Sequence, residues 1–164
     1  MSNENGPREH ALRQHLVNML KGGGAHVKFE SVITGFPAKL RGNKPAGAPH
    51  TAWQLLEHMR IAQWDIVEFS KNRRHKSPDF PEGYWPKTEA PTGADEWNAS
   101  VKAFRKDLKA MQDLVSALHT DLYARLPWGD GQTILRQALV LSDHNAYHLG
   151  QLVLLRRLLG AWED

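Results

Sequence analysis

The chain of 164 residues contains no cysteine. This absence excludes disulfide bonds, thiolate metal ligands and a cysteine nucleophile. A long apolar run is also missing, because Arg156 and Arg157 interrupt the longest one directly after Leu155, so no segment is predicted to cross a membrane. A strong excess of charge is missing too. The formal net charge of +3 gives no argument for a nucleic-acid partner.

Targeting signals and strand patterns are equally absent. The N-terminus has no basic segment followed by an apolar one, so no signal peptide is predicted and the expected location is the cytoplasm. No strand-like alternation or internal repeat occurs. We expect residues 1–6 to form a flexible N-terminus and residues 7–164 to form one domain.

The positive signal in the sequence is helical periodicity. Apolar residues recur at helical spacing in five segments, 7–21, 25–34, 52–71, 94–118 and 133–159. Glycine- and proline-containing stretches separate these segments, among them 35–49, 77–93 and 126–131. Four long helices with three sizeable connections predict an all-α fold, an antiparallel four-helix bundle.

The last of these helices carries two histidines on one face. Because positions i and i+4 project to the same side of a helix, His144 and His148 point in one direction. On a helical wheel with His144 at zero, His148 lies at about 40°, inside the apolar stripe. A metal ion bound by one nitrogen of each ring would satisfy part of the bonding that buried imidazoles need. Two core histidines bonded to carbonyls or buried water are the alternative.

A third histidine, His58, lies at the edge of the apolar face of the helix over 52–71. In a bundle this edge can meet the face that carries His144 and His148, which would form a three-histidine site. Three protein ligands leave a position open for water or substrate, as in catalytic metal sites. Several divalent ions accept imidazole, so the ligand type does not choose among them.

Two segments of the chain resemble the DinB/YfiT-like superfamily: His50–His58 (HTAWQLLEH) and Asp143–Leu152 (DHNAYHLGQL). The resemblance implies a four-helix bundle that holds one divalent metal ion, with zinc or nickel most expected. The metal ligands that it implies are His58, His144 and His148. Within that site, the candidates to hydrogen-bond to the ligands are Asp65 and Gln151.

The resemblance also implies an activity, because some members of the superfamily are S-transferases that use bacillithiol or mycothiol. The function expected for this chain is therefore a metal-dependent transfer reaction between a small-molecule substrate and a thiol cosubstrate. A non-catalytic bundle that binds a metal or small ligand and a metal-dependent hydrolase are alternatives. A nucleic-acid-associated protein, suggested by the basic run 72–76, ranks last.

A homodimer is expected from the apolar residues on the far side of the last helix. These residues exceed what one core face needs, although other bundle helices could equally cover them. They are Leu135, Leu139, Leu149 and Val153.

Overall fold

The computed structural model describes residues 5–162, and these residues contain helices but no β-strand. The helices are α1 (Asn5–Lys21), α2 (Phe29–Ile33), α3 (Ala52–Lys71), α4 (Ala94–Ser116) and α5 (Ile134–Leu158). Two short 3-10 turns, Ala38–Leu40 and Glu82–Tyr84, lie in the connections. The predicted all-α fold is confirmed. The sequence predicts a flexible segment over residues 1–6. Residues 1–4 lie outside the described residues, and α1 begins at Asn5.

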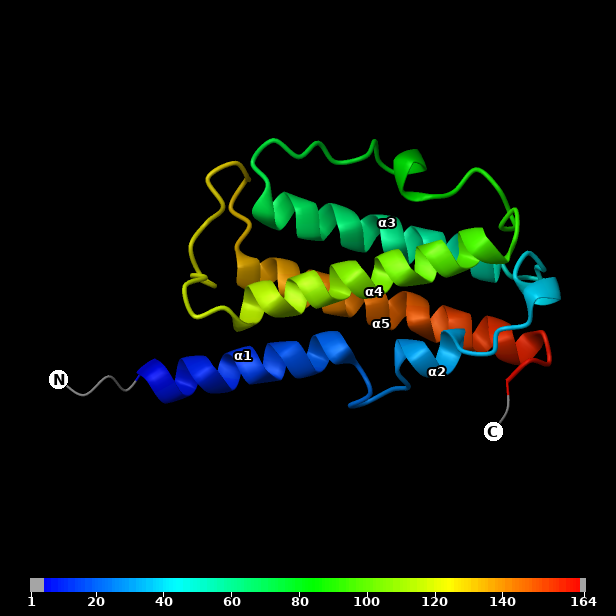
Figure 1. Ribbon diagram of the computed structural model, residues 1–164, viewed down its shortest axis with the longest axis horizontal. Coiled ribbons are helices and arrows are strands. Elements are labelled where there is room, and N and C mark those ends of the chain that lie inside the picture. The colour runs from blue at the N-terminus through cyan, green and yellow to red at the C-terminus, as the bar shows by residue number, and fades with distance from the viewer. Residues whose placement is uncertain (1–4, 163–164) are drawn as a thin grey trace.

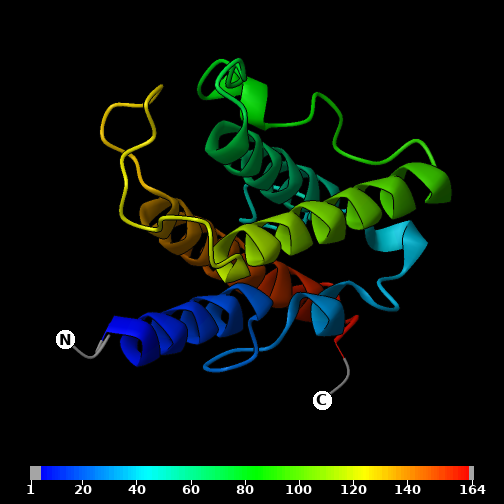
Figure 2. The same ribbon diagram turned by 60° about the vertical axis from the view of Figure 1, so that its left-hand side comes forward.

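The four long helices pack side by side, and the short α2 lies against α5 (Figure 1). α3 and α4 run in the same direction, whereas α1 and α5 run opposite to them (Figures 1 and 2). Contacts between α3 and α4 follow this parallel order, because Glu57 meets Ser100 and Gln63 meets Phe104. The antiparallel arrangement expected from the sequence therefore holds for α3 with α5 and for α1 with α4, but not for α3 with α4.

The two helices that carry the histidines begin at well-formed caps. Thr51 accepts a hydrogen bond from the Gln54 N–H at 3.2 Å, and the Gln54 side chain accepts one from the Thr51 N–H at 3.0 Å. This reciprocal pair is a capping box, which satisfies two N–H groups that the helix itself leaves without acceptors. Thr133 likewise accepts from the Arg136 N–H at 3.1 Å.

Two apolar clusters form the core. The first lies among α2, α3, α4 and the C-terminal half of α5, and the second lies among α1, α3, α4 and the N-terminal half of α5. No described helix combines the length and apolarity needed to cross a membrane. The largest fully buried side chains include Phe104, Leu56 and Met59 in the first cluster and Met111 and Leu141 in the second.

The four apolar residues of the expected dimer surface on α5 differ in their exposure. Leu149 is 5% exposed and belongs to the first cluster, while Leu135 and Val153 pack against the two clusters. Leu139 alone among the four residues of the expected dimer surface stays exposed, at 42%. The chain itself therefore covers part of the surface expected for a second copy, and the homodimer stays a prediction.

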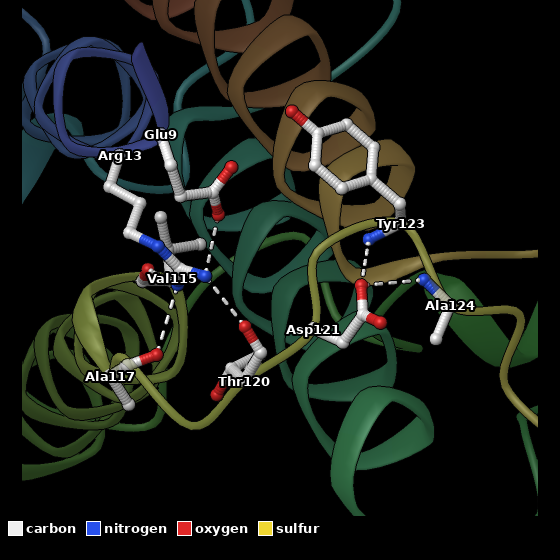
Figure 3. A network of polar contacts seen from close by, with 8 residues as sticks. All are labelled: Glu9, Arg13, Val115, Ala117, Thr120, Asp121, Tyr123 and Ala124. Atoms are coloured by element: carbon white, nitrogen blue, oxygen red, sulfur yellow. Dashed lines mark hydrogen bonds and ion pairs between the residues drawn. The ribbon is translucent and has the colours of Figure 1, made fainter. Parts of the chain in front are cut away.

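The C-terminal end of α4 depends on a buried arginine of α1 (Figure 3). Arg13 is 5% exposed and pairs with Glu9 at 2.7 Å. The last carbonyls of a helix have no donor within the helix, so a guanidinium can replace the missing N–H groups. The Arg13 guanidinium donates to the carbonyls of Val115 (2.7 Å), Ala117 (2.9 Å) and Thr120 (2.6 Å).

Removing this guanidinium should destabilise the protein strongly. Arg13→Met keeps the apolar stem but leaves three carbonyl acceptors without their donor, so we expect a loss of about 3 kcal/mol in the free energy of unfolding. Urea denaturation monitored by circular dichroism measures this loss. Arg8→Met, an exposed position on the same helix, is the control and should change little. Equal stabilities for the two variants would contradict the role given to Arg13.

Candidate metal centre

Three histidines from two helices meet between α3 and α5. His58 comes from α3, and His144 and His148 come from α5. Their ligand nitrogens all lie within 4.8 Å of one another. Nε2 of His58 is 3.1 Å from Nε2 of His148 and 3.1 Å from Nε2 of His144. His148 is 8% exposed and the other two are partly buried. The structure thus brings together the three residues that the sequence singled out.

The partners of the other ring nitrogens determine where the protons lie on two of these rings. Nδ1 of His58 is 2.9 Å from the main-chain oxygen of Tyr84, and Nδ1 of His148 is 2.7 Å from the side-chain oxygen of Gln151. Both oxygens can only accept, so both Nδ1 atoms must donate. A neutral imidazole has one N–H, and therefore Nε2 of each ring presents a lone pair to the other.

A single N–H cannot serve as hydrogen-bond donor to all the Nε2 atoms that meet here. His144 is free to carry its proton on Nε2 and to donate it to His58, because its own Nδ1 is buried and has no partner among the described residues. That donation leaves Nε2 of His148 without any donor, facing a second lone pair at 3.1 Å. One cation placed among the three nitrogens would remove this repulsion, so the donor set fits a metal ion.

The two separations from Nε2 of His58 also fit one shared ion. Two imidazole nitrogens at the usual distance of about 2.0–2.1 Å from a tetrahedral ion lie about 3.3 Å apart. Two nitrogens at a right angle in an octahedral site lie about 3.0 Å apart. The observed 3.1 Å falls between these values, so the spacing accepts a divalent metal without choosing its identity.

The surroundings keep these histidines neutral, which is the form that binds a metal. Burial, together with the neighbouring His148 and His58, lowers the pKa of His144 to about 4. Burial is also the main cause that lowers the pKa values of His58 and His148. Protons therefore compete little with a metal ion at neutral pH.

The connection between α3 and α4 covers one side of the centre. The ring of Trp85 stacks on His58 with centroids 3.9 Å apart and planes 3° apart. On its other side Trp85 stacks on His50, at 4.0 Å and 22°. Because the preceding residue, Tyr84, accepts the Nδ1–H bond of His58, the same short segment fixes both the proton and the plane of this ring.

The two polar residues expected near the ligands play different parts. Gln151 bonds directly to His148, as described above. Asp65 contacts none of the three histidines and instead accepts from the Tyr84 hydroxyl at 2.7 Å, with Nε2 of His75 at 2.7 Å on its other oxygen. Burial and this carboxylate raise the pKa of Tyr84 to about 12, so the phenol stays protonated and donates. Asp65 thus holds the covering loop.

Sequence reasoning gave no role to His75 and none to the carbonyl of Tyr84. His75 lies in a basic run that reads as a solvated helix end, yet its side chain is only 7% exposed. A main-chain carbonyl has no signature in a sequence. The aromatic pair Tyr84-Trp85 inside a long, proline-rich loop was the available signal that this loop packs onto the bundle.

Comparison with known proteins points to one family. A family model described as the DinB superfamily matches residues 25–152, a range that contains the three histidines and Gln151. No curated protein and no solved structure matches the chain.

The first prediction from this geometry concerns metal content. Protein purified without an affinity tag or chelator should contain one divalent ion per chain, measured by mass spectrometry, and His144→Ala should lose it. His119→Ala, at an exposed position outside the centre, is the matched control and should keep the ion. A wild-type protein that is metal-free and also refuses added zinc and nickel would contradict the metal centre.

The second prediction concerns Gln151. Removing the acceptor in Gln151→Ala leaves Nδ1 of His148 unpaired, so we expect metal affinity to fall by about 10–100-fold. Gln151→Glu retains an acceptor for the same N–H and should restore most of the affinity. Competition with a chelating dye measures both. Gln14→Ala on the surface of α1 is the control, and an equal loss in all three variants would refute the role of Gln151.

Proposed function

Because the chain belongs to the DinB superfamily, which includes metal-binding proteins, we propose that it is a divalent-metal-dependent enzyme. Within that class we propose transfer of a low-molecular-weight thiol of the bacillithiol or mycothiol type to an electrophilic small molecule. The observation that carries the proposal is the convergence of three imidazole Nε2 atoms, a donor set that one shared cation would satisfy.

Three ligands from the protein favour a catalytic over a structural role. Structural metal sites are usually closed by four protein ligands, whereas catalytic sites keep a position for water or substrate. Among the described residues, no fourth histidine and no carboxylate joins the group formed by His58, His144 and His148. A divalent ion bound there would lower the pKa of a bound thiol or water and so provide a nucleophile at neutral pH.

The residues of the chain supply orientation. Gln151 and the Tyr84 carbonyl keep Nδ1 of their histidines protonated, which directs both Nε2 lone pairs toward the same point. Trp85 covers one face of His58 and excludes water there. Tyr147 is 65% exposed and its ring lies 4.9 Å from that of His148, on the side open to solvent. This open side is where we place the approach of substrates.

The absence of cysteine supports a thiol cosubstrate, since no protein thiol can serve as the nucleophile. In the proposed reaction, the cosubstrate R–SH loses its proton and its sulfur forms a bond to an electrophilic carbon of R′–X. The bond from that carbon to X breaks, and X leaves with the electron pair and takes up a proton. The products are the thioether R–S–R′ and HX.

The proposal predicts thiol-dependent turnover. Metal-loaded protein should accelerate consumption of bacillithiol or mycothiol in the presence of an alkylating electrophile such as iodoacetamide, and His148→Ala should return the rate to the uncatalysed level with an unchanged circular dichroism spectrum. His10→Ala, exposed on α1, is the control. Metal binding with no turnover of either thiol would refute the transferase and leave the non-catalytic binding bundle.

A further inference from the structure

An apolar pocket lies beside the histidine centre. It has a volume of about 300 Å³ and is formed between the segment 46–50 and the C-terminal half of α5. Leu55 and Leu155, each 3% exposed, belong to both the pocket and the core, while Leu154 and Leu158 stand at its exposed side. No aspartate, glutamate, lysine or arginine among the described residues lines it.

Two residues connect this pocket with the metal centre. Gln151 lines the pocket, and its side-chain oxygen also accepts the hydrogen bond from His148. His50 lines the pocket too, and its ring stacks on Trp85, which in turn stacks on His58. The pocket and the histidines are therefore separated by no more than one layer of side chains.

We infer that this pocket binds the uncharged, apolar part of the electrophilic substrate. The inference rests on the proposed function and assigns the pocket to one of its two substrates. The volume is at the lower end of the range of small-molecule sites, which are lined mainly by apolar groups with a few polar ones. Here the polar groups are His50 and Gln151, both at the side of the metal centre.

The same lining argues against the thiol as the occupant. A thiol cosubstrate rich in hydroxyl groups or carrying charges would lose its hydration in the pocket and would find few hydrogen-bond partners and no countercharge. An apolar group gains free energy from leaving water at about 25 cal/mol per Å² of buried surface. The pocket therefore selects the electrophile by its apolar part, and the thiol must approach the histidines from another side.

Binding of a neutral fluorescent probe tests the pocket without any turnover. N-phenyl-1-naphthylamine should bind the wild-type protein both metal-loaded and after chelation. Leu154→Asp places a charge in the wall and Ala46→Trp fills the space, and each should weaken probe binding by about tenfold or more. Both positions are exposed, so the fold should survive. Leu139→Asp, at an exposed position of the same helix outside the pocket, is the matched control.

Wild-type protein that fails to bind the probe, or variants that bind it like the control, would overturn the pocket as an apolar subsite. This result does not depend on whether the protein is an enzyme. A wild type without thiol turnover would refute the proposed function and with it the electrophile as occupant. The probe measurement would still show whether the pocket binds apolar molecules.

Turnover with two electrophiles tests the occupant. In Ala46→Trp, kcat/KM for the aromatic 1-chloro-2,4-dinitrobenzene should fall by about tenfold relative to wild type. The value for the small iodoacetamide and the KM of the thiol should stay unchanged. An Ala46→Trp protein in which kcat/KM falls equally for both electrophiles would overturn the assignment of the pocket to the electrophile. A rise in the KM of the thiol instead would overturn it as well.

Discussion

Imidazole nitrogens that repel one another meet between α3 and α5, and the surrounding chain must keep them there. Nε2 of His58 and Nε2 of His148 face each other as lone pairs at 3.1 Å, an arrangement that is unfavourable without a cation. Such an arrangement persists only where the surroundings hold each ring. Here α3 and α5 fix the Cα positions of the histidines. The Tyr84 carbonyl and Gln151 keep the protons of His58 and His148 on Nδ1.

The topology of the bundle explains why a loop, and not a helix, completes the centre. α3 and α4 run parallel, so the chain must return over the length of α3, about 30 Å for a helix of this size, before α4 begins (Figure 1). The connection 72–93 makes this return along α3, and Asp65 fixes it through Tyr84 and His75. An antiparallel pair joined by a short turn would leave His58 without its acceptor and without Trp85.

Much of the frame could be predicted from the sequence because it depends on local rules. Helical periodicity located the long helices, and the spacing of His144 and His148 placed both on one face. The direction of α4 could not be predicted, because periodicity carries no information on which neighbours run parallel. The pairing of His75 with Asp65 could not be predicted either, because a histidine in a basic run is expected to be exposed to solvent and only the fold shows that it is buried.

Gln151 belongs to both the histidine centre and the apolar pocket and so connects them. One amide side chain both accepts the hydrogen bond from Nδ1 of His148 and lines the apolar pocket, so a ligand that orders this amide also orders His148. Thermodynamic linkage makes the effect reciprocal: any factor by which an occupant of the pocket changes metal affinity is the factor by which the metal changes affinity for that occupant. His50 makes a second connection, because it lines the pocket and its ring stacks on Trp85, which in turn stacks on His58. The site therefore behaves as one unit built from a helix pair, a return loop and a shared amide.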